Sequence, residues 1–417
     1  MSTPTRRPPR AAGRVVAVLL GLAPAALAMA QTAPSYDSLL QRLDELPGTR
    51  AGTALAEAAD ARAEQARALP NPTLSWSTED AAGSGAYAGM GKAQTVLTLS
   101  QPLELWGQRG ARIGAARADA DAAAMRGTQS RSDAAGVLAS AYAQAESALR
   151  RYALAEEALG LIRDDAAAVD AMVAQGREPQ LRAVQARSEV ADASAALDEA
   201  LAFRDAALAR LAAIALLETP VQSLDSGLLD RPPPSPRAAD TAALPVRIAA
   251  AEAKAADRQV EVERKRALPA LSLTAAQTRF REDRAHAYTL GVSLSVPLFD
   301  RNRGGIRAAG AELRAAEARL DQQRRTSAAD RLSALATLKA AGSRTRAADA
   351  SVAAAQEAYR LARIGVDAGR ITQLELRSTR AALIAARGTA VDARLARVAA
   401  EIDLARLEGR APFMEAQ

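Results

Sequence analysis

The sequence predicts an α+β membrane protein built by internal duplication, in which each half carries two short strands between long helices. Three landmarks occur twice in the same order: a Leu-Pro pair, a Pro-Leu pair that follows two strand-like segments, and a glycine turn. The copies lie 199, 195 and 193 residues apart, so the halves differ by few insertions: Leu69 and Leu268, Pro102 and Pro297, Gly176 and Gly369. Such an ordered repeat indicates one structural unit used twice.

The landmarks divide the chain into a signal peptide (1–30), a first repeat (31–217), a Pro-rich connector (218–246), a second repeat (247–410) and a tail (411–417). We expect strands at residues 71–80, 93–102, 270–280 and 287–297, and long helices at 107–175, 179–217, 303–367 and 373–409. The connector is either a flexible linker or a belt packed outside the helices, and we favour the belt. A short amphipathic helix is expected over Tyr36–Leu46.

The first 30 residues have the layout of a secretory signal peptide. Four arginines precede the apolar run Val15–Leu22, and Ala28-Met29-Ala30 offers a small-x-small cleavage site. An uncleaved membrane anchor is the alternative, which the short apolar run and its Pro24 disfavour. We therefore expect an exported chain. Because the sequence has no cysteine to acylate, we do not expect a lipoprotein.

The composition argues against enzyme chemistry and against nucleic acid as a partner. With no cysteine and a single histidine, His286, the chain cannot build thiolate metal sites, cysteine nucleophiles or histidine-based triads. Without the four signal-peptide arginines, the 54 basic residues fall to 50 against 48 acidic ones, and the two signs are interspersed. His286 lies beside two acidic residues in a loop, which is a weak ligand set. We expect no catalytic residue, no bound metal and no cofactor.

The strand segments have the alternation of a membrane β-barrel. From Tyr288 to Val296 every second residue is apolar, and Thr, Gly and Ser fill the positions between them. Apolar side chains would face lipid and small polar ones a wet interior, although a soluble half-buried sheet is the alternative. Trp76 is expected at a membrane interface, and Trp106 either there or at the junction with the helices. No run of about 18 apolar residues follows the signal peptide, so no transmembrane helix is expected.

The strand number and the helix lengths together set the expected architecture. Four strands leave open edges in hydrocarbon and barrels begin at about eight strands, so at least two chains, and by preference three, must pool their strands. A proline-free helix of about 65 residues would extend about 100 Å, and a second helix would return antiparallel after each glycine turn. Alanine dominates and aromatic residues make up 3% of the chain, so the helices can approach closely.

Three motifs resemble those of the TolC-like outer-membrane factors, and the resemblance covers nearly all of the chain after the signal peptide. Residues 69–74 (LPNPTL) resemble the entry to that family's first strand, and residues 296–306 (VPLFDRNRGGI) resemble the exit from its fourth. Residues 368–376 (AGRITQLEL) resemble the periplasmic tip motif. The form PLFDRNRG is particularly similar to the CzcC-like branch, which serves heavy-metal efflux.

The resemblance implies a homotrimer in the outer membrane, in contact with its lipid. Three chains would form a 12-stranded β-barrel that continues into a 12-helix periplasmic tunnel. The tunnel would dock with a periplasmic adaptor and an inner-membrane RND-type pump, and it would conduct heavy-metal cations passively. A multidrug or other small-molecule channel is the alternative. A periplasmic adaptor or a helical stalk protein is a further one, but neither would carry the duplicated membrane strands.

The resemblance also implies three groups of functional residues. Adaptor contacts are expected at the two tips: Gly176, Arg177, Gln180, Leu181, Gly369, Arg370, Thr372, Gln373 and Leu374. Lumen-gate candidates are Glu375 and Asp367. Ser378 and Ile371 occupy positions where the best-known gate has an acidic residue and an arginine, so part of that gate is missing. The strand–helix junctions are expected at Pro102, Gly107, Pro297 and Gly304. The alternative for the tip residues is a plain helix end, and the alternative for Glu375 is a solvated surface glutamate. The alternative for the junction residues is that they are ordinary strand-end residues.

Overall fold

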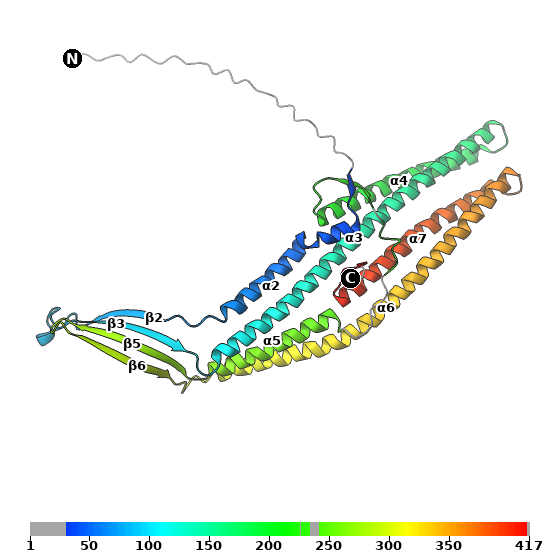
Figure 1. Cartoon of the computed structure of the whole chain (residues 1–417). Helices are drawn as coiled ribbons and strands as arrows, with labels where there is room; N and C mark the ends of the chain where they lie inside the picture. The colour runs from blue at the N-terminus through cyan, green and yellow to red at the C-terminus, as the bar shows by residue number, and fades with distance from the viewer. Residues whose placement is uncertain (1–30, 226, 234–241, 415–417) are drawn as a thin grey trace, which may run out of the picture.

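Four long strands form one antiparallel sheet at one end of the molecule, and the helices extend from its other end (Figure 1). The computed structural model describes residues 31–225, 227–233 and 242–414, so the predicted signal peptide lies outside the described residues. The sheet order is β2-β3-β5-β6. Each repeat supplies one hairpin, and β3 pairs with β5 to join the two hairpins at the centre: β2 Thr73–Glu79, β3 Gln94–Leu103, β5 Ala270–Phe280, β6 His286–Ser295.

Two long helical hairpins form most of the helical part. The first consists of α3 (Gln108–Ala174) and α4 (Gln180–Ile214), and the second of α6 (Arg303–Asp367) and α7 (Gln373–Glu408). The ends of these helices and of the four long strands differ from the expected ends by at most three residues. The 67-residue α3 is about 100 Å long at 1.5 Å per residue. Within the described part of the chain, no helix combines the length and the apolar content that crossing a bilayer requires.

Two further helices, which the sequence analysis did not predict, lead into the strands. They are α2 (Pro47–Gln65), which packs along α3, and α5 (Leu244–Arg266), which packs along α3 and α6. Near the sheet the wall consists of α2, α3, α5 and α6, and further away it consists of α3, α4, α6 and α7 (Figure 1). The short helices therefore take the places that α4 and α7 occupy nearer the tips, and each level of the wall has four helices.

The expected helix over residues 36–46 is divided in two. The α-helix α1 covers Tyr36–Gln41, and a single 3₁₀ turn covers Leu43–Glu45. Its apolar side chains Tyr36, Leu39 and Leu43 are buried, as an amphipathic segment requires. Tyr36 packs edge-on against Tyr142 of α3, with ring centroids 5.8 Å apart. These residues lie in the main hydrophobic core, which is at mid-height in the helical part.

The described part of the connector packs against this core. Its strand β4 (Val221–Leu224) pairs in parallel with β1 (Gln31–Ala33), and Leu228 and Leu229 are fully buried. The carboxylate of Glu146, on α3, accepts hydrogen bonds from the backbone N–H groups of Leu228 (2.6 Å) and Leu229 (2.9 Å). A buried carboxylate with two N–H donors is well stabilised, because each bond is charge-assisted.

Ion pairs extend this attachment to the second hairpin. Asp230 pairs with Arg150 of α3 and with Arg394 of α7 (2.8 Å), and the Arg397 side chain donates to the Leu229 carbonyl (2.6 Å). The hydrogen bond from Arg150 is the main cause that lowers the pKa of Asp230, so its carboxylate stays charged at neutral pH. The connector segment 227–231 thus joins α3 to α7, and we name it the connector clamp.

Replacing Glu146 with glutamine tests the clamp. In Glu146→Gln the amide oxygen can still accept the two backbone bonds that Oε2 accepts, but it carries no charge, and the amide NH₂ replaces the Oε1 that pairs with Arg150. The loss of charge assistance and of this pair costs about 2–3 kcal/mol. We expect a lower thermal unfolding midpoint and faster thermolysin cleavage at Leu228 and Leu229 in the purified protein, because both leucines are fully buried in the wild type. The matched control is Glu156→Gln, which alters an exposed carboxylate on the same helix and is expected to leave both readouts unchanged. Equal behaviour of the two variants would contradict the clamp.

Candidate functional site

The two faces of the sheet differ in chemistry along all four strands. Residues that pair across strands share a face, and the register therefore sorts the side chains into two sets. One face is largely apolar and exposed, with Leu290 82% and Tyr288 78% exposed: Leu74, Trp76, Leu97, Leu99, Leu271, Leu273, Tyr288, Leu290, Val292, Leu294. The other face is mostly small and polar: Thr73, Ser75, Ser77, Thr98, Ser100, Ser272, Thr274, Thr289, Gly291, Ser293, Ser295. This is the division that a membrane strand needs between lipid and a wet interior.

The sheet has two open edges. In the described part of the chain, β2 and β6 each pair on one side only. An exposed edge presents a row of N–H and C=O groups that can pair with a strand of another chain. Four strands therefore form a segment of a sheet whose continuation must come from elsewhere.

At the first junction, between β3 and α3, the chain turns through Pro102 and Gly107. Pro102 pairs with Ser272 near the end of β3, and Gly107 has φ +82° at the N-cap of α3. Arg112 donates to the carbonyls of Ala66 (3.1 Å) and Ala68 (3.0 Å), which follow α2. These carbonyls would otherwise lack partners at a helix end. The role of Arg112 was not predicted, because its partners lie more than 40 residues away in sequence.

The second junction differs from the sequence prediction in one respect. Pro297 follows β6 as expected, but Gly304 lies in the first turn of α6, and the left-handed residue is Asn302, with φ +51°. The Asn302 side chain donates to Glu263 of α5, at its carbonyl (3.0 Å) and its carboxylate (2.6 Å). A Cβ on Gly305 would lie 2.3 Å from the Asn302 Oδ1. Gly305 thus makes room for this contact, and Asn302 rather than Gly304 adopts the left-handed conformation at this junction.

Both tips have the same backbone motif. At the first tip Arg177 N–H donates to the Met172 carbonyl (2.9 Å), and at the second Arg370 N–H donates to the Gly365 carbonyl (2.8 Å). The glycines before them, Gly176 and Gly369, have φ +71° and +70°. Each tip is therefore a Schellman motif, in which a left-handed glycine ends the helix. This geometry agrees with the alternative that each glycine only ends a helix. It also means that the two tips expose the same backbone conformation.

The predicted adaptor-contact residues lie together at the two tips and are accessible. Leu181 and Leu374, which match each other in the repeats, are 65% and 61% exposed. A single exposed leucine needs no explanation, but its recurrence at the same place in both tips gives them the same apolar side chain. All the other predicted contacts are exposed except for Gln373, which is half-buried: Gly176, Arg177, Gln180, Gly369, Arg370, Thr372.

The gate candidates are only partly described. Glu375 and Thr372 form a capping box at the start of α7: Glu375 N–H donates to Thr372 Oγ1 (3.3 Å), and Thr372 N–H donates to the Glu375 carboxylate (3.0 Å). The Glu375 carboxylate thus has a structural role, and it is also exposed. Asp367 is the last residue of α6, and its side chain lies outside the described part. A gate role for either residue stays a prediction.

Buried arginines connect the two hairpins below the tips. Arg380, on α7, is 4% exposed; it pairs with Asp165 of α3 and lies 3.8 Å from Glu189 of α4. Arg377, one turn earlier, also pairs with Glu189. Burial lowers the pKa of the Arg380 guanidinium, and the two carboxylates supply the opposing charge. The sequence analysis missed this tip cluster (Asp165, Glu189, Arg377, Arg380), because its members come from three helices.

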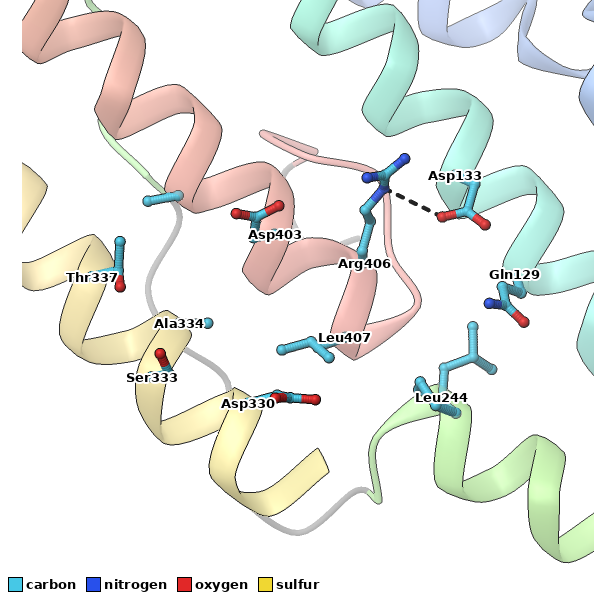
Figure 2. A pocket seen from close by; sticks show the side chains of 12 residues that line it. Gln129, Asp133, Leu244, Asp330, Ser333, Ala334, Thr337, Asp403, Arg406 and Leu407 are labelled. Carbon is cyan, nitrogen blue, oxygen red and sulfur yellow. Dashed lines mark ion pairs between the residues drawn. The ribbon is translucent and has the colours of Figure 1, made fainter. Parts of the chain in front are cut away.

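A cavity of about 390 Å³ lies where α5 begins and α7 ends (Figure 2). Its lining includes Asp330 of α6 and Asp403 of α7, and Arg406 pairs with Asp133 across it (3.3 Å). Leu244, the first residue of α5, closes one side. Among the residues that the structure describes, no group of three or more acidic or histidine side chains is placed to hold a metal ion. The cavity is therefore the gap between two successive helices of the wall.

A sheet with one lipid-type face, attached to a helical wall about 100 Å long, defines the subunit of a channel that crosses a membrane and projects from it. The chain belongs to the outer membrane efflux protein family, whose sequence profile matches residues 40–215 and 241–410. This is a family of outer-membrane channels and not of enzymes.

Relatives and a solved structure agree with this assignment. The chain is 39% identical to the nickel-cobalt-cadmium resistance protein NccC of Alcaligenes xylosoxydans xylosoxydans, over 82% of this chain and 78% of NccC. It is 41% identical to the nickel and cobalt resistance protein CnrC of Cupriavidus metallidurans, over 79% of each. Its fold matches that of CusC with a TM-score of 0.78, at 18% identity, over 92% of this chain and 95% of CusC. The predicted TolC-like fold and family are confirmed.

The tip cluster predicts a measurable separation of the hairpins. Arg380→Met keeps the length of the side chain but removes its charge, which leaves Asp165 unpaired and Glu189 with Arg377 alone. Since the native sequence has no cysteine, spin labels on Arg177→Cys and Arg370→Cys report the distance between the tips without background. In protein diluted with unlabelled chains, we expect Arg380→Met to lengthen and broaden that distance distribution.

The matched control is Arg360→Met on α6. Arg360 pairs with Glu357 on its own helix (2.7 Å), so its loss breaks no link between the hairpins. An unchanged distance in Arg380→Met, or an equal change in both variants, would contradict the role of the tip cluster.

Proposed function

We propose that three copies of this chain form an outer-membrane channel that passively conducts heavy-metal cations out of the cell. The two open edges of the sheet support the trimer: three four-stranded segments supply twelve strands, and the edge strands β2 and β6 of neighbouring copies satisfy each other. The four helices at each level of the wall supply twelve helices for a tunnel that continues the barrel into the periplasm. Export through residues 1–30, without lipidation, belongs to the same proposal.

The metal assignment rests on the relatives. NccC and CnrC, each about 40% identical over most of the chain, are named for resistance to nickel, cobalt and cadmium. A passive conduit needs no resident metal site. Selectivity would then come mainly from the inner-membrane pump. A channel for drugs or other small molecules is the alternative.

The partner surface is the pair of tips. A periplasmic adaptor, linked to an RND-type pump in the inner membrane, would dock on the accessible residues that follow Gly176 and Gly369. The repeated backbone motif and the matched pair Leu181 and Leu374 support this, since both tips offer one kind of surface to a repeated partner. Three copies of exposed Glu375 would form an acidic ring that attracts cations to the tunnel entrance.

Growth of a strain that lacks this gene tests the substrate. We expect sensitivity to graded nickel, cobalt, cadmium or zinc, restored by the wild-type gene, and unchanged tolerance of a hydrophobic drug panel. The physical reason is that removing the conduit leaves the pump without an exit through the outer membrane. Sensitivity to drugs with normal metal tolerance would keep the channel but reject the metal assignment.

In-cell photocrosslinking tests the partner surface. A photoreactive amino acid at Leu181 or Leu374 is expected to capture the adaptor, since both side chains point into water at the tips. The same substitution at Leu332, a 71% exposed leucine far from the tips on α6, is expected to capture no adaptor. Capture from Leu332 alone would place the docking surface elsewhere on the helical wall.

A further inference from the structure

Two rows of side chains cross the apolar face of the sheet at the end farthest from the helices. In register, the first row is Trp76, Leu97, Gln277 and Tyr288, and the second is Thr78, Thr95, Arg279 and His286. Aromatic side chains at both ends of the first row are typical of a membrane–water interface. The next row contains an arginine and a histidine directly opposite each other, and we name this pair the rim pair.

The rim pair lies at the depth of lipid headgroups. Leu294, near the helices, and Tyr288 are six residues apart on β6, which is about 20 Å along the strand. Arg279 lies two residues beyond Gln277 on β5, about 7 Å further. On a strand tilted by about 40° the span from Leu294 to Tyr288 covers about 15 Å of depth, so an apolar band of about 25 Å continues toward the helices through the exposed Val296 and Leu298. The rim pair lies on the other side of Tyr288, just outside that band. All the described α-helices lie at the opposite end, so on the proposed function this rim faces the outer leaflet (Figure 1).

The rim pair has no acidic partner in the part of the chain that the structure describes. Arg279 and His286 are exposed, and neither side chain has an ion pair or hydrogen bond there. The register places Glu79 on the polar face, opposite Gln94, and Asp80 accepts a hydrogen bond from Gln94 (2.8 Å).

The nearby turn supplies two more acids. Glu282 pairs with Lys92 (3.5 Å), and Asp283 lies in the turn between β5 and β6, beyond the row. The two faces of the rim thus differ in charge: the apolar face has a free guanidinium, and the polar face has a carboxylate.

We propose that the rim pair binds a phosphate group of lipid A, the lipid anchor of lipopolysaccharide in the outer leaflet. The guanidinium of Arg279 can hold a phosphate through two parallel N–H bonds, and the imidazole of His286 can donate a third. The acyl chains would then lie on the apolar face below Trp76 and Tyr288. This inference rests on the proposed function, because it requires the sheet to span the outer membrane with the helices in the periplasm.

Native mass spectrometry of the purified full-length protein tests this site. The probes are bis-phosphorylated lipid A and the same lipid with both phosphates removed. We expect the wild type to retain the phosphorylated lipid preferentially. The Arg279→Gln/His286→Gln variant is expected to lose that preference, with a reduction in affinity of about fivefold or more, which is the contribution of one arginine at an anionic surface. Arg279→Lys, which keeps the charge but not the two parallel N–H bonds, is expected to retain only part of the preference. Elution of the double variant as the same oligomer as the wild type shows that its loss is not misfolding.

The matched control is Arg284→Gln, which removes the same charge from the turn between β5 and β6, outside the row. We expect less than a twofold change in this control. Equal retention of both lipids by the wild type, or an equal loss in Arg284→Gln, would overturn the rim pair; the second result would indicate a diffuse contact of the basic turn with a charged surface or protein.

The two proposals fail in different ways. If the wild type forms a membrane-inserted trimer that confers metal resistance but does not distinguish the lipids, only the rim pair is rejected. If it forms no such trimer, the proposed function is rejected with it.

Discussion

The backbone's need for hydrogen bonds in hydrocarbon is the constraint on which the rest of this structure depends. Each unsatisfied N–H or C=O group there costs several kcal/mol. Three ladders, β2–β3, β3–β5 and β5–β6, satisfy the strands within the chain and leave only the outer sides of β2 and β6. Four strands spaced about 4.8 Å apart are too narrow to close on themselves. The sheet is therefore the part of the chain suited to hydrocarbon, because in the described residues no helix is apolar enough for that environment.

In the helical wall the backbone hydrogen bonds are satisfied within each helix, but hydrophobic stabilisation is scarce, since alanine side chains bury little apolar area. One buried CH₂ group contributes about 0.8 kcal/mol, whereas a buried leucine contributes about 1.5–3 kcal/mol. The large buried side chains are concentrated at mid-height, around Tyr142, Leu138 and Leu211. There the Tyr36 hydroxyl donates to the Pro412 carbonyl (2.9 Å), so the first and last described segments meet the connector clamp at one level. Away from this level, specific polar links such as the tip cluster must hold the thin helices in register.

The sequence could predict features that depend on residues close together in the chain, but not features that depend on residues far apart in it. The strands and long helices follow from local patterns, and the capping box of Thr372 and Glu375 also has a local T-x-x-E signal. The helices α2 and α5 have a usable signal as well, a proline at the first turn at Pro47 and Pro245, but their alanine content matches their surroundings.

Long-range contacts had no such signal. The roles of Glu146, Asn302 and Arg380 depend on partners 82, 39 and 215 residues away, which no local pattern reveals. Asn302 also shows that glycines alone do not mark every left-handed backbone position in a sequence, because asparagine tolerates that conformation too.

The two repeats have the same tip backbone but support it unequally. The α7 start has its capping box, and the Ile371 side chain packs so closely over Gly365 that a Cβ there would lie 2.6 Å from it. The α4 start follows Pro179 and has no side-chain cap. A cap contributes about 1 kcal/mol, so the second tip is locally the stiffer one. The arginines Arg377 and Arg380 follow on α7 and form ion pairs with Glu189 and Asp165 of the first hairpin.

A partner that separates the hairpins must therefore break this cluster and the α3–α7 ion pairs Glu157–Arg387 and Arg151–Asp392, rather than unfold either tip. Separating the hairpins returns both members of each pair to water, so its cost is smaller than the cost of about 3–5 kcal/mol for deleting one member of a buried pair. It is small enough for the binding energy of a docked protein to offset. The asymmetry between the repeats thus places the cations of the tip cluster on α7 and its carboxylates on α3 and α4.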